Sequence, residues 1–177
     1  MRIFVTGTGR CGTVTFSKAC SHIENFSSGH ETYSTKLFEL DKSLITDNRI
    51  EVDPHFSQFL PLITKLYPDA RWVHLIREKE PCVKSLSKTT GLGYYIKFAS
   101  MSKSENDREV VANVFYDMVN DNIAKWIKDM DYRIMHLERL HEEWSGFWNW
   151  IGAKGNLNDS LAELSIKHNS SKKKYGK

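Results

Sequence analysis

The residues with the clearest chemical potential lie in a glycine-rich stretch near the start of the chain. Residues 7–16 read GTGRCGTVTF, after a short apolar run and before a stretch of helical character. A strand, a glycine-rich turn and a helix form the setting in which backbone N–H groups and a helix N-terminus bind phosphate. Gly7 and Gly12 are spaced as in a Walker A loop, but Thr13 replaces the lysine of that motif and Arg10 carries the charge instead. The stretch therefore predicts an anion-binding loop, unless it is a decayed nucleotide loop or an ordinary turn.

A second candidate anion contact follows a predicted strand in the middle of the chain. Residues 71–76, RWVHLI, form the clearest strand of the sequence, and Arg77 comes directly after it. Ser85 lies eight residues beyond Arg77, in a predicted helix whose first turn contains Pro81. An arginine leaving a strand and a hydroxyl near a helix N-terminus can converge on one phosphate. Arg77 could instead pair with a surface carboxylate such as Glu80.

Together, the two stretches resemble the sulfotransferase family, whose members transfer a sulfuryl group from 3′-phosphoadenosine 5′-phosphosulfate (PAPS). The 5′-phosphosulfate loop of the family, roughly K/R-S-G-T-T/S, is similar to residues 10–14, RCGTV. The 3′-phosphate motif, an arginine after a strand and a serine eight residues later, is similar to Arg77 and Ser85. The resemblance implies a PAPS-dependent sulfotransferase that needs no metal. The residues that it implies for the 5′-phosphosulfate are Arg10, Cys11, Gly12, Thr13, Val14 and Thr15.

The likeness extends toward the tyrosylprotein sulfotransferase branch. In that branch a glutamate of a GEET-like turn follows the loop arginine by twenty-one residues, and here GHET places Glu31 at this distance from Arg10. Residues 52–54, VDP, resemble the KDP of the branch, and residues 67–77, YPDARWVHLIR, resemble its FPNAKFLLMVR. Two further segments are similar to the branch: residues 136–140, HLERL, resemble its HYEQL, and residues 147–152, FWNWIG, resemble its fLG helix end. The resemblance therefore covers most of the chain, from residue 3 to about residue 152.

The group that accepts a proton from the acceptor has three candidates. The resemblance implies Glu31, and a carboxylate can act as the base if it lies within hydrogen-bond reach of the acceptor. His55, in the phrase DPHF, is the alternative, because many cytosolic sulfotransferases use a histidine from this region. Asp53 is the third candidate. Glu31 could instead cap a following helix, and His55 could simply begin one.

Several positions depart from the family pattern. Val14 lacks the second hydroxyl of the loop, Cys11 replaces its serine, and Val52 replaces the lysine of KDP, a cation that would assist the leaving phosphate. The chain is also short for the family. Two other functions therefore stay open: a binding protein that keeps the anion loop without turnover, and a nucleotide or small-molecule kinase on the same fold. The missing Walker A lysine argues against the kinase.

The segments that must position these residues alternate between strands and helices. Strands are predicted at residues 3–5, 49–52, 71–76 and 132–137. Helices are predicted at residues 14–23, within 31–43, and at 56–66, 81–87, 107–128, 144–151 and 157–166. This alternation predicts an α/β domain of the P-loop type, with three layers and a central, mostly parallel sheet between helices. Ligands bind such sheets beyond the carboxyl ends of the strands, where the glycine-rich loop and Arg77 are expected.

The composition is that of one globular domain, predicted over residues 1–167. The net charge of +3 is too small to indicate nucleic acid, and no apolar run approaches the roughly 20 residues of a membrane span. Cys11, Cys20 and Cys82 lack the spacing of a disulfide framework, which indicates reduced thiols in the cytoplasm. The histidines and cysteines show no metal-ligand spacing. We therefore expect a cytoplasmic protein that acts without a metal, a membrane or a nucleic acid.

A basic tail, HNSSKKKYGK at residues 168–177, ends the chain. It is either a solubilising end or, as the resemblance implies, a flap over the anionic cofactor. In the second interpretation Ser170 and Lys172 are candidate cofactor contacts. The acceptor, expected to carry a hydroxyl or an amine, and the oligomeric state are not specified by the sequence.

Overall fold

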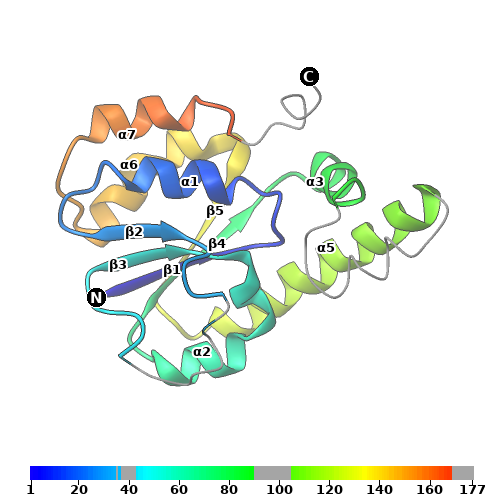
Figure 1. Ribbon diagram of the computed structural model, residues 1–177, viewed down its shortest axis with the longest axis horizontal. Helices are drawn as coiled ribbons and strands as arrows, with labels where there is room; N and C mark the ends of the chain where they lie inside the picture. Colours follow the sequence, from blue (N-terminus) through cyan, green and yellow to red (C-terminus); the bar gives the residue numbers. More distant parts are fainter. Residues whose placement is uncertain (35, 37–42, 90–104, 169–177) are drawn as a thin grey trace.

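A parallel β-sheet forms the centre of the molecule (Figure 1). The computed structural model describes residues 1–34, 36, 43–89 and 105–168. Five strands pair in the order β2-β3-β1-β4-β5, and each pairing is parallel. Their bounds are β1 Arg2–Thr6, β2 Ser27–His30, β3 Arg49–Val52, β4 Arg71–Ile76 and β5 Tyr132–His136. Because the strands are parallel, their carboxyl ends meet at one edge of the sheet.

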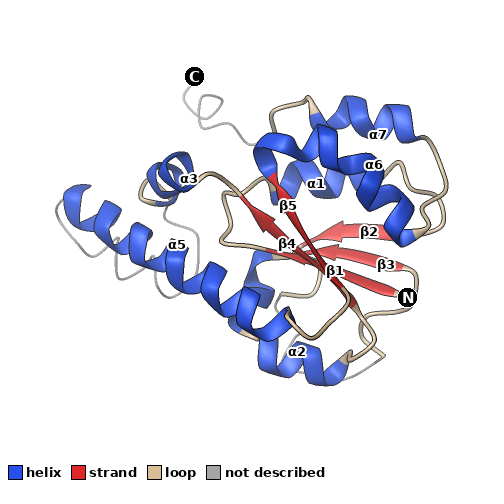
Figure 2. Cartoon of the chain, turned by 180° about the vertical axis from the view of Figure 1, so that it is seen from behind, coloured by secondary structure: helices blue, strands red, loops and turns tan. Residues whose placement is uncertain are grey.

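Helices cover both faces of this sheet (Figures 1 and 2). One face carries α1, α6 and α7, the other carries α2 and α5, and α3 follows the carboxyl end of β4. The bounds are α1 Thr13–Cys20, α2 Leu60–Leu66, α3 Lys79–Leu86, α5 Glu105–Ile127, α6 Leu140–Ile151 and α7 Leu157–Leu164. The prediction of an α/β architecture with a parallel sheet between helices is confirmed.

Buried aromatic rings hold the elements on either side of the glycine-rich loop. On one face, Phe16 of α1 packs edge-on against Trp144 and Phe147, with ring centroids 4.8 and 5.1 Å away. On the opposite face, Phe4 of β1 packs against Trp72, with centroids 5.2 Å apart. All of these rings are fully buried, and burial of each phenylalanine among them stabilises the fold by about 1.5–3 kcal/mol. The loop between β1 and α1 is therefore anchored at both of its ends.

Strand β2 was not expected from the sequence. Its residues, SSGH, are polar and partly exposed, so they carry no apolar alternation. The strand forms instead at the edge of the sheet, where it pairs with β3 in a register that sets His30 beside Val52. This register decides where the chain leaves the sheet at Glu31.

The helix predicted over residues 56–66 is interrupted. A 3-10 helix, η2 (Pro54–Gln58), ends before Phe59, and α2 begins at Leu60. Pro61 explains the break, because its ring cannot donate a hydrogen bond to the carbonyl of Ser57 and would collide with it in a continuous helix. The Ser57 carbonyl instead accepts a hydrogen bond from Asn122 Nδ2 at 3.2 Å.

The helix predicted within residues 31–43 falls largely outside the described residues, and the tail contacts Ser170 and Lys172 lie wholly outside them. The prediction of a single domain over residues 1–167 stays a prediction. Within the ranges that the structure describes, no helix combines the length and the apolar character needed to cross a bilayer.

Candidate functional site

The glycine-rich loop follows a path that two of its glycines make possible. Gly12, the N-cap of α1, has a φ of 92°, and a Cβ there would lie 2.3 Å from Leu137 Cδ1. A Cβ on Gly7 would lie 2.4 Å from the Leu75 carbonyl oxygen. Between them, Arg10 has a φ of 54°, which non-glycine residues rarely adopt. The loop therefore packs closely against the sheet and turns so that α1 starts at the carboxyl edge of the sheet.

The start of α1 presents backbone donors at this edge. The first helical hydrogen bond runs from Phe16 N to Gly12 O at 3.0 Å, so the N–H groups of the first turn have no partner within the helix. The first turn contains no acidic residue, and Thr13 lies buried within it. Burial raises the pKa of Cys11 to about 12, so its thiol stays neutral. Because the side chain is fully buried, the backbone N–H is the group of Cys11 that could serve an anion. A helix start with free N–H groups and no acidic residue is one that can bind an anion.

The predicted contacts of the second motif converge on the loop. Arg10 Nε donates to Ser85 Oγ at 3.0 Å, and Arg77 Nη1 donates to the Arg10 carbonyl oxygen at 2.9 Å. The backbone of Arg77 is held in turn, because the Tyr116 hydroxyl donates to its carbonyl oxygen at 2.7 Å. Arg77 therefore reaches the loop and forms no ion pair with Glu80, although both residues are described. A guanidinium has five N–H donors, so both arginines keep donors for an anion.

Glu31 leaves the edge of the sheet in a strained turn. Its φ is 54°, and its backbone N–H donates to the Val52 carbonyl at 3.1 Å. The next residue is anchored by the buried carboxylate of Glu51, which accepts from Thr32 N at 2.6 Å and is paired with Arg49 at 2.7 Å. Positive φ values of non-glycine residues concentrate at functional sites. In the described part of the chain they occur at Arg10, Glu31 and Asn48, so two of the three are predicted site residues.

His55 lies close to the turn at Glu31 and is held by hydrogen bonds to Asp53. The Asp53 carboxylate is fully buried, and its Oδ1 accepts from His55 N at 2.8 Å and faces His55 Nδ1 at 2.9 Å. Its Oδ2 accepts from the Ser34 hydroxyl at 2.6 Å. The hydrogen bond to Asp53 raises the pKa of His55, partial burial opposes this, and the charges of Asp53 and Glu31 add to the rise. The backbone bond also shows that His55 begins a helix, since Asp53 is the N-cap of η2.

We predict that the His55 imidazole titrates with a midpoint above 6.5 and that Asp53→Asn lowers this midpoint. The pKa of His55 is raised in the folded state, so the contact between His55 and Asp53 stabilises the fold fully when the pH is below the pKa of histidine in the unfolded chain, near 6.5. This stabilisation is lost as the pH rises through the higher folded pKa. NMR titration of the histidine ring signals measures the His55 midpoint in the unmutated protein and in Asp53→Asn. His74 is the internal control, because burial lowers its pKa. A His55 midpoint at or below that of His74 would contradict the Asp53 contact.

Two residues of the site were missed by sequence reasoning. His30 Nε2 lies 3.0 Å from Thr13 Oγ1, and the phrase GHET gave a signal only for the glutamate beside it. Tyr116 lies on the buried side of α5. The apolar periodicity of that helix gives no sign that the Tyr116 hydroxyl donates a hydrogen bond to a backbone carbonyl.

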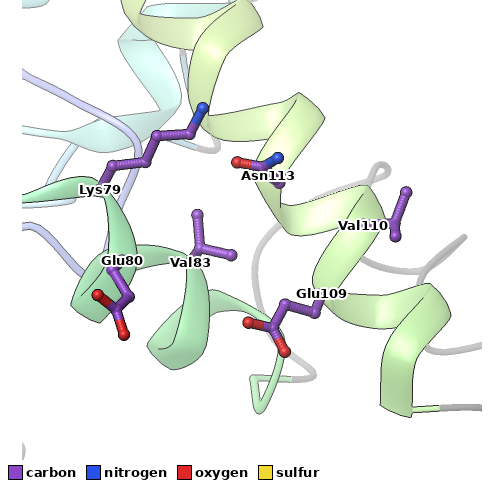
Figure 3. A pocket seen from close by; sticks show the side chains of 6 residues that line it. All are labelled: Lys79, Glu80, Val83, Glu109, Val110 and Asn113. Carbon is purple, nitrogen blue, oxygen red and sulfur yellow. The ribbon is translucent and has the colours of Figure 1, made fainter.

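A pocket of about 560 Å³ lies between α3 and α5 (Figure 3), and one of its lining residues, Lys79, lies over the Tyr116 ring at 5.9 Å. The described residues that line it are Lys79, Glu80, Val83, Glu109, Val110 and Asn113. Lys79 is paired with Asp117 at 2.7 Å. None of the lining residues is among the predicted site residues, so the pocket does not indicate which reaction or ligand the site serves.

The structure thus brings the predicted residues into two groups. Arg10, Arg77 and Ser85 form one group, and Glu31, Asp53 and His55 form the other. Among the residues that the structure describes, no set of three or more His, Cys, Asp or Glu side chains is placed to hold a metal ion. The chain matches no protein-family model and no curated protein. Its function must therefore be argued from the geometry of these two groups.

Proposed function

We propose that the chain is a sulfotransferase that moves a sulfuryl group from PAPS to a hydroxyl or amine acceptor. The observation that carries this proposal is the hydrogen-bonded group of Arg10, Arg77 and Ser85 beside the start of α1. Arg10 is far from Arg77 and Ser85 in the sequence, but the three residues meet in the fold. They supply the two guanidinium groups and the hydroxyl that a nucleotide with a phosphate group at each end would need. A glycine-rich loop after the central strand β1 supports a fold of the P-loop type.

The donors at the site fit a ligand with two separate anionic groups. The N–H groups at the start of α1, with Thr13, suit one anion. Arg77 follows β4 and Ser85 lies in α3, and the two suit the other anion, since charge-assisted hydrogen bonds are the strongest that an anion can accept. Arg10 belongs to the loop that leads into α1, and it has a left-handed backbone conformation. The Arg10–Ser85 hydrogen bond joins the two ends of this donor set.

On this proposal, binding and proton transfer belong to different residues. PAPS supplies a sulfuryl group on a phosphate that leaves as part of 3′-phosphoadenosine 5′-phosphate (PAP). Arg10 and the α1 N–H groups stabilise the charge that grows on the bridging oxygen, while Arg77 and Ser85 hold the 3′-phosphate. Glu31 removes the acceptor proton as the new bond to sulfur forms. Arginine and the helix start balance the charge, so the reaction needs no metal ion.

Nucleotide binding tests the proposal directly. We expect PAP to bind and adenosine 5′-phosphate to bind much more weakly, because only a 3′-phosphate can accept the further hydrogen bonds that Arg77 and Ser85 are able to donate. Arg77→Ala should weaken PAP about ten- to a hundredfold, because a hydrogen bond to a charged group contributes about 1.5–3 kcal/mol. It should change the affinity for adenosine 5′-phosphate far less. Isothermal titration calorimetry measures all four affinities.

Arg133→Ala is the matched control, since it removes the same charge from a side chain that lies over the Trp150 ring at 5.3 Å. It should leave PAP affinity unchanged. Equal affinity of the unmutated protein for PAP and adenosine 5′-phosphate would refute the assignment. Binding of ATP in preference to PAP would favour a kinase, and PAP binding without transfer to any acceptor would favour a binding protein.

A further inference from the structure

His30 is the last residue of β2, and its imidazole lies at the start of α1. Its Nε2 is 3.0 Å from Thr13 Oγ1 and 3.8 Å from Glu31 Oε1, so one nitrogen faces two oxygens of the site. The pairing of β2 with β3 sets His30 beside Val52, whose side chain is buried and apolar. Only 25% of the His30 side chain is exposed. The imidazole is therefore held between the helix start and the carboxylate.

We propose that His30 is a positioning residue that donates its Nε2–H to Thr13 Oγ1 and so turns the Thr13 hydroxyl hydrogen toward the 5′-phosphate. This inference rests on the proposed function, because it requires a phosphate at the start of α1. A threonine hydroxyl has one hydrogen and two lone pairs. An ionised phosphate accepts hydrogen bonds, so Thr13 serves it only as a donor. The lone pairs of Thr13 are then left for a donor on its other side, and His30 Nε2 occupies that position.

The tautomer of His30 decides whether Thr13 can do this. With its hydrogen on Nδ1 alone, Nε2 would accept the Thr13 hydrogen, and the hydroxyl would be turned away from the phosphate. The Glu31 carboxylate lies on the Nε2 side of the ring, and its negative charge favours a hydrogen there. The orientation of Thr13 matters more in this chain because the next residue, Val14, has no hydroxyl.

A double-mutant cycle on PAP affinity tests the coupling of His30 to Thr13. Calorimetric titration gives the PAP dissociation constants of the unmutated protein, His30→Ala, Thr13→Val and the double variant. We expect His30→Ala to weaken PAP roughly three- to tenfold, the scale of one hydrogen bond. Because His30 acts through Thr13, adding His30→Ala to Thr13→Val should cause no further loss. His30→Gln keeps an N–H donor in a similar place and should restore affinity to within about twofold.

Adenosine 3′-phosphate is the matched ligand, because it lacks the 5′-phosphate that Thr13 would contact. Its affinity should not change in His30→Ala, whereas a general loss of folded structure would weaken both nucleotides. NMR of the unmutated protein labelled with ¹⁵N-histidine reports the tautomer without any substitution. We expect a hydrogen on His30 Nε2 in the PAP complex.

Three results would each overturn the role of His30 and leave the sulfotransferase proposal in place. They are additive losses in the cycle, an equal loss for adenosine 3′-phosphate, and a hydrogen on Nδ1 alone in the PAP complex. If the unmutated protein does not bind PAP, the proposed function fails, and the role of His30 fails with it.

Discussion

Replacement of Arg10 by alanine is expected to slow sulfuryl transfer by about a hundred- to a thousandfold, the usual effect of removing one preorganised donor from a developing oxyanion. PAP affinity should fall much less. The reason is that negative charge moves onto the bridging oxygen only during transfer, so a donor placed there acts mainly on the transition state. Single-turnover rates with PAPS and calorimetry with PAP separate the two quantities.

Arg10→Lys is the control for this experiment, because it keeps the positive charge and loses the planar fork that reaches Ser85. It should retain more activity than Arg10→Ala. Arg10 also holds Arg77 through its carbonyl oxygen, and this backbone contact is present in both variants. If Arg10→Ala lowers the transfer rate and PAP affinity by the same factor, Arg10 is a binding residue only.

Glu31→Gln is expected to lower turnover by about a hundredfold or more, the usual scale for the loss of a general base. Glutamine keeps the shape of the side chain and the backbone hydrogen bond to Val52, so the turn should persist. PAP affinity should fall by no more than the roughly three- to tenfold expected for His30→Ala, because Glu31 reaches the phosphate-binding residues only through His30 and Thr13. Steady-state rates at saturating PAPS, together with PAP titration, measure this separation.

His55→Ala distinguishes the competing base. If His55 were the base, the rate would fall as the pH drops through its pKa, which Asp53 raises above 6.5. A rate that persists well below this pH therefore excludes His55. Loss of turnover in His55→Ala, with Glu31→Gln active, would show that the histidine is the base. If both variants stay active, Asp53 or a group on the acceptor takes the proton.

Much of the fold and part of the site follow from local sequence. The strand before the glycine-rich loop and the strand before Arg77 are apolar runs, and both lie in the interior of the sheet. A parallel sheet then requires that whatever follows these two strands lies at the same edge. The meeting of Arg10, Arg77 and Ser85 is a consequence of that rule together with the eight-residue spacing of the second motif.

The residues that were missed depend on tertiary contacts. Strand β2 is a polar edge strand, so its existence rests on its pairing with β3 rather than on burial of its side chains. The position of His30 depends on that pairing, and no periodicity in the sequence could have placed it against Thr13. The turn at Glu31 likewise depends on Glu51, a buried carboxylate that a reader of the sequence would assign to the surface.

The two groups of the site lie on different strands, and this has an evolutionary consequence. One group belongs to the central strands β1 and β4, and the other to β2 and β3 at one margin of the sheet. His30 and Thr13 form a contact between them. Mutations near β2 can therefore accumulate while the contacts among Arg10, Arg77 and Ser85 stay intact. On the proposed function, the group that would hold PAP and the group that would take the proton can therefore vary separately, and His30 with Thr13 is the contact that couples them.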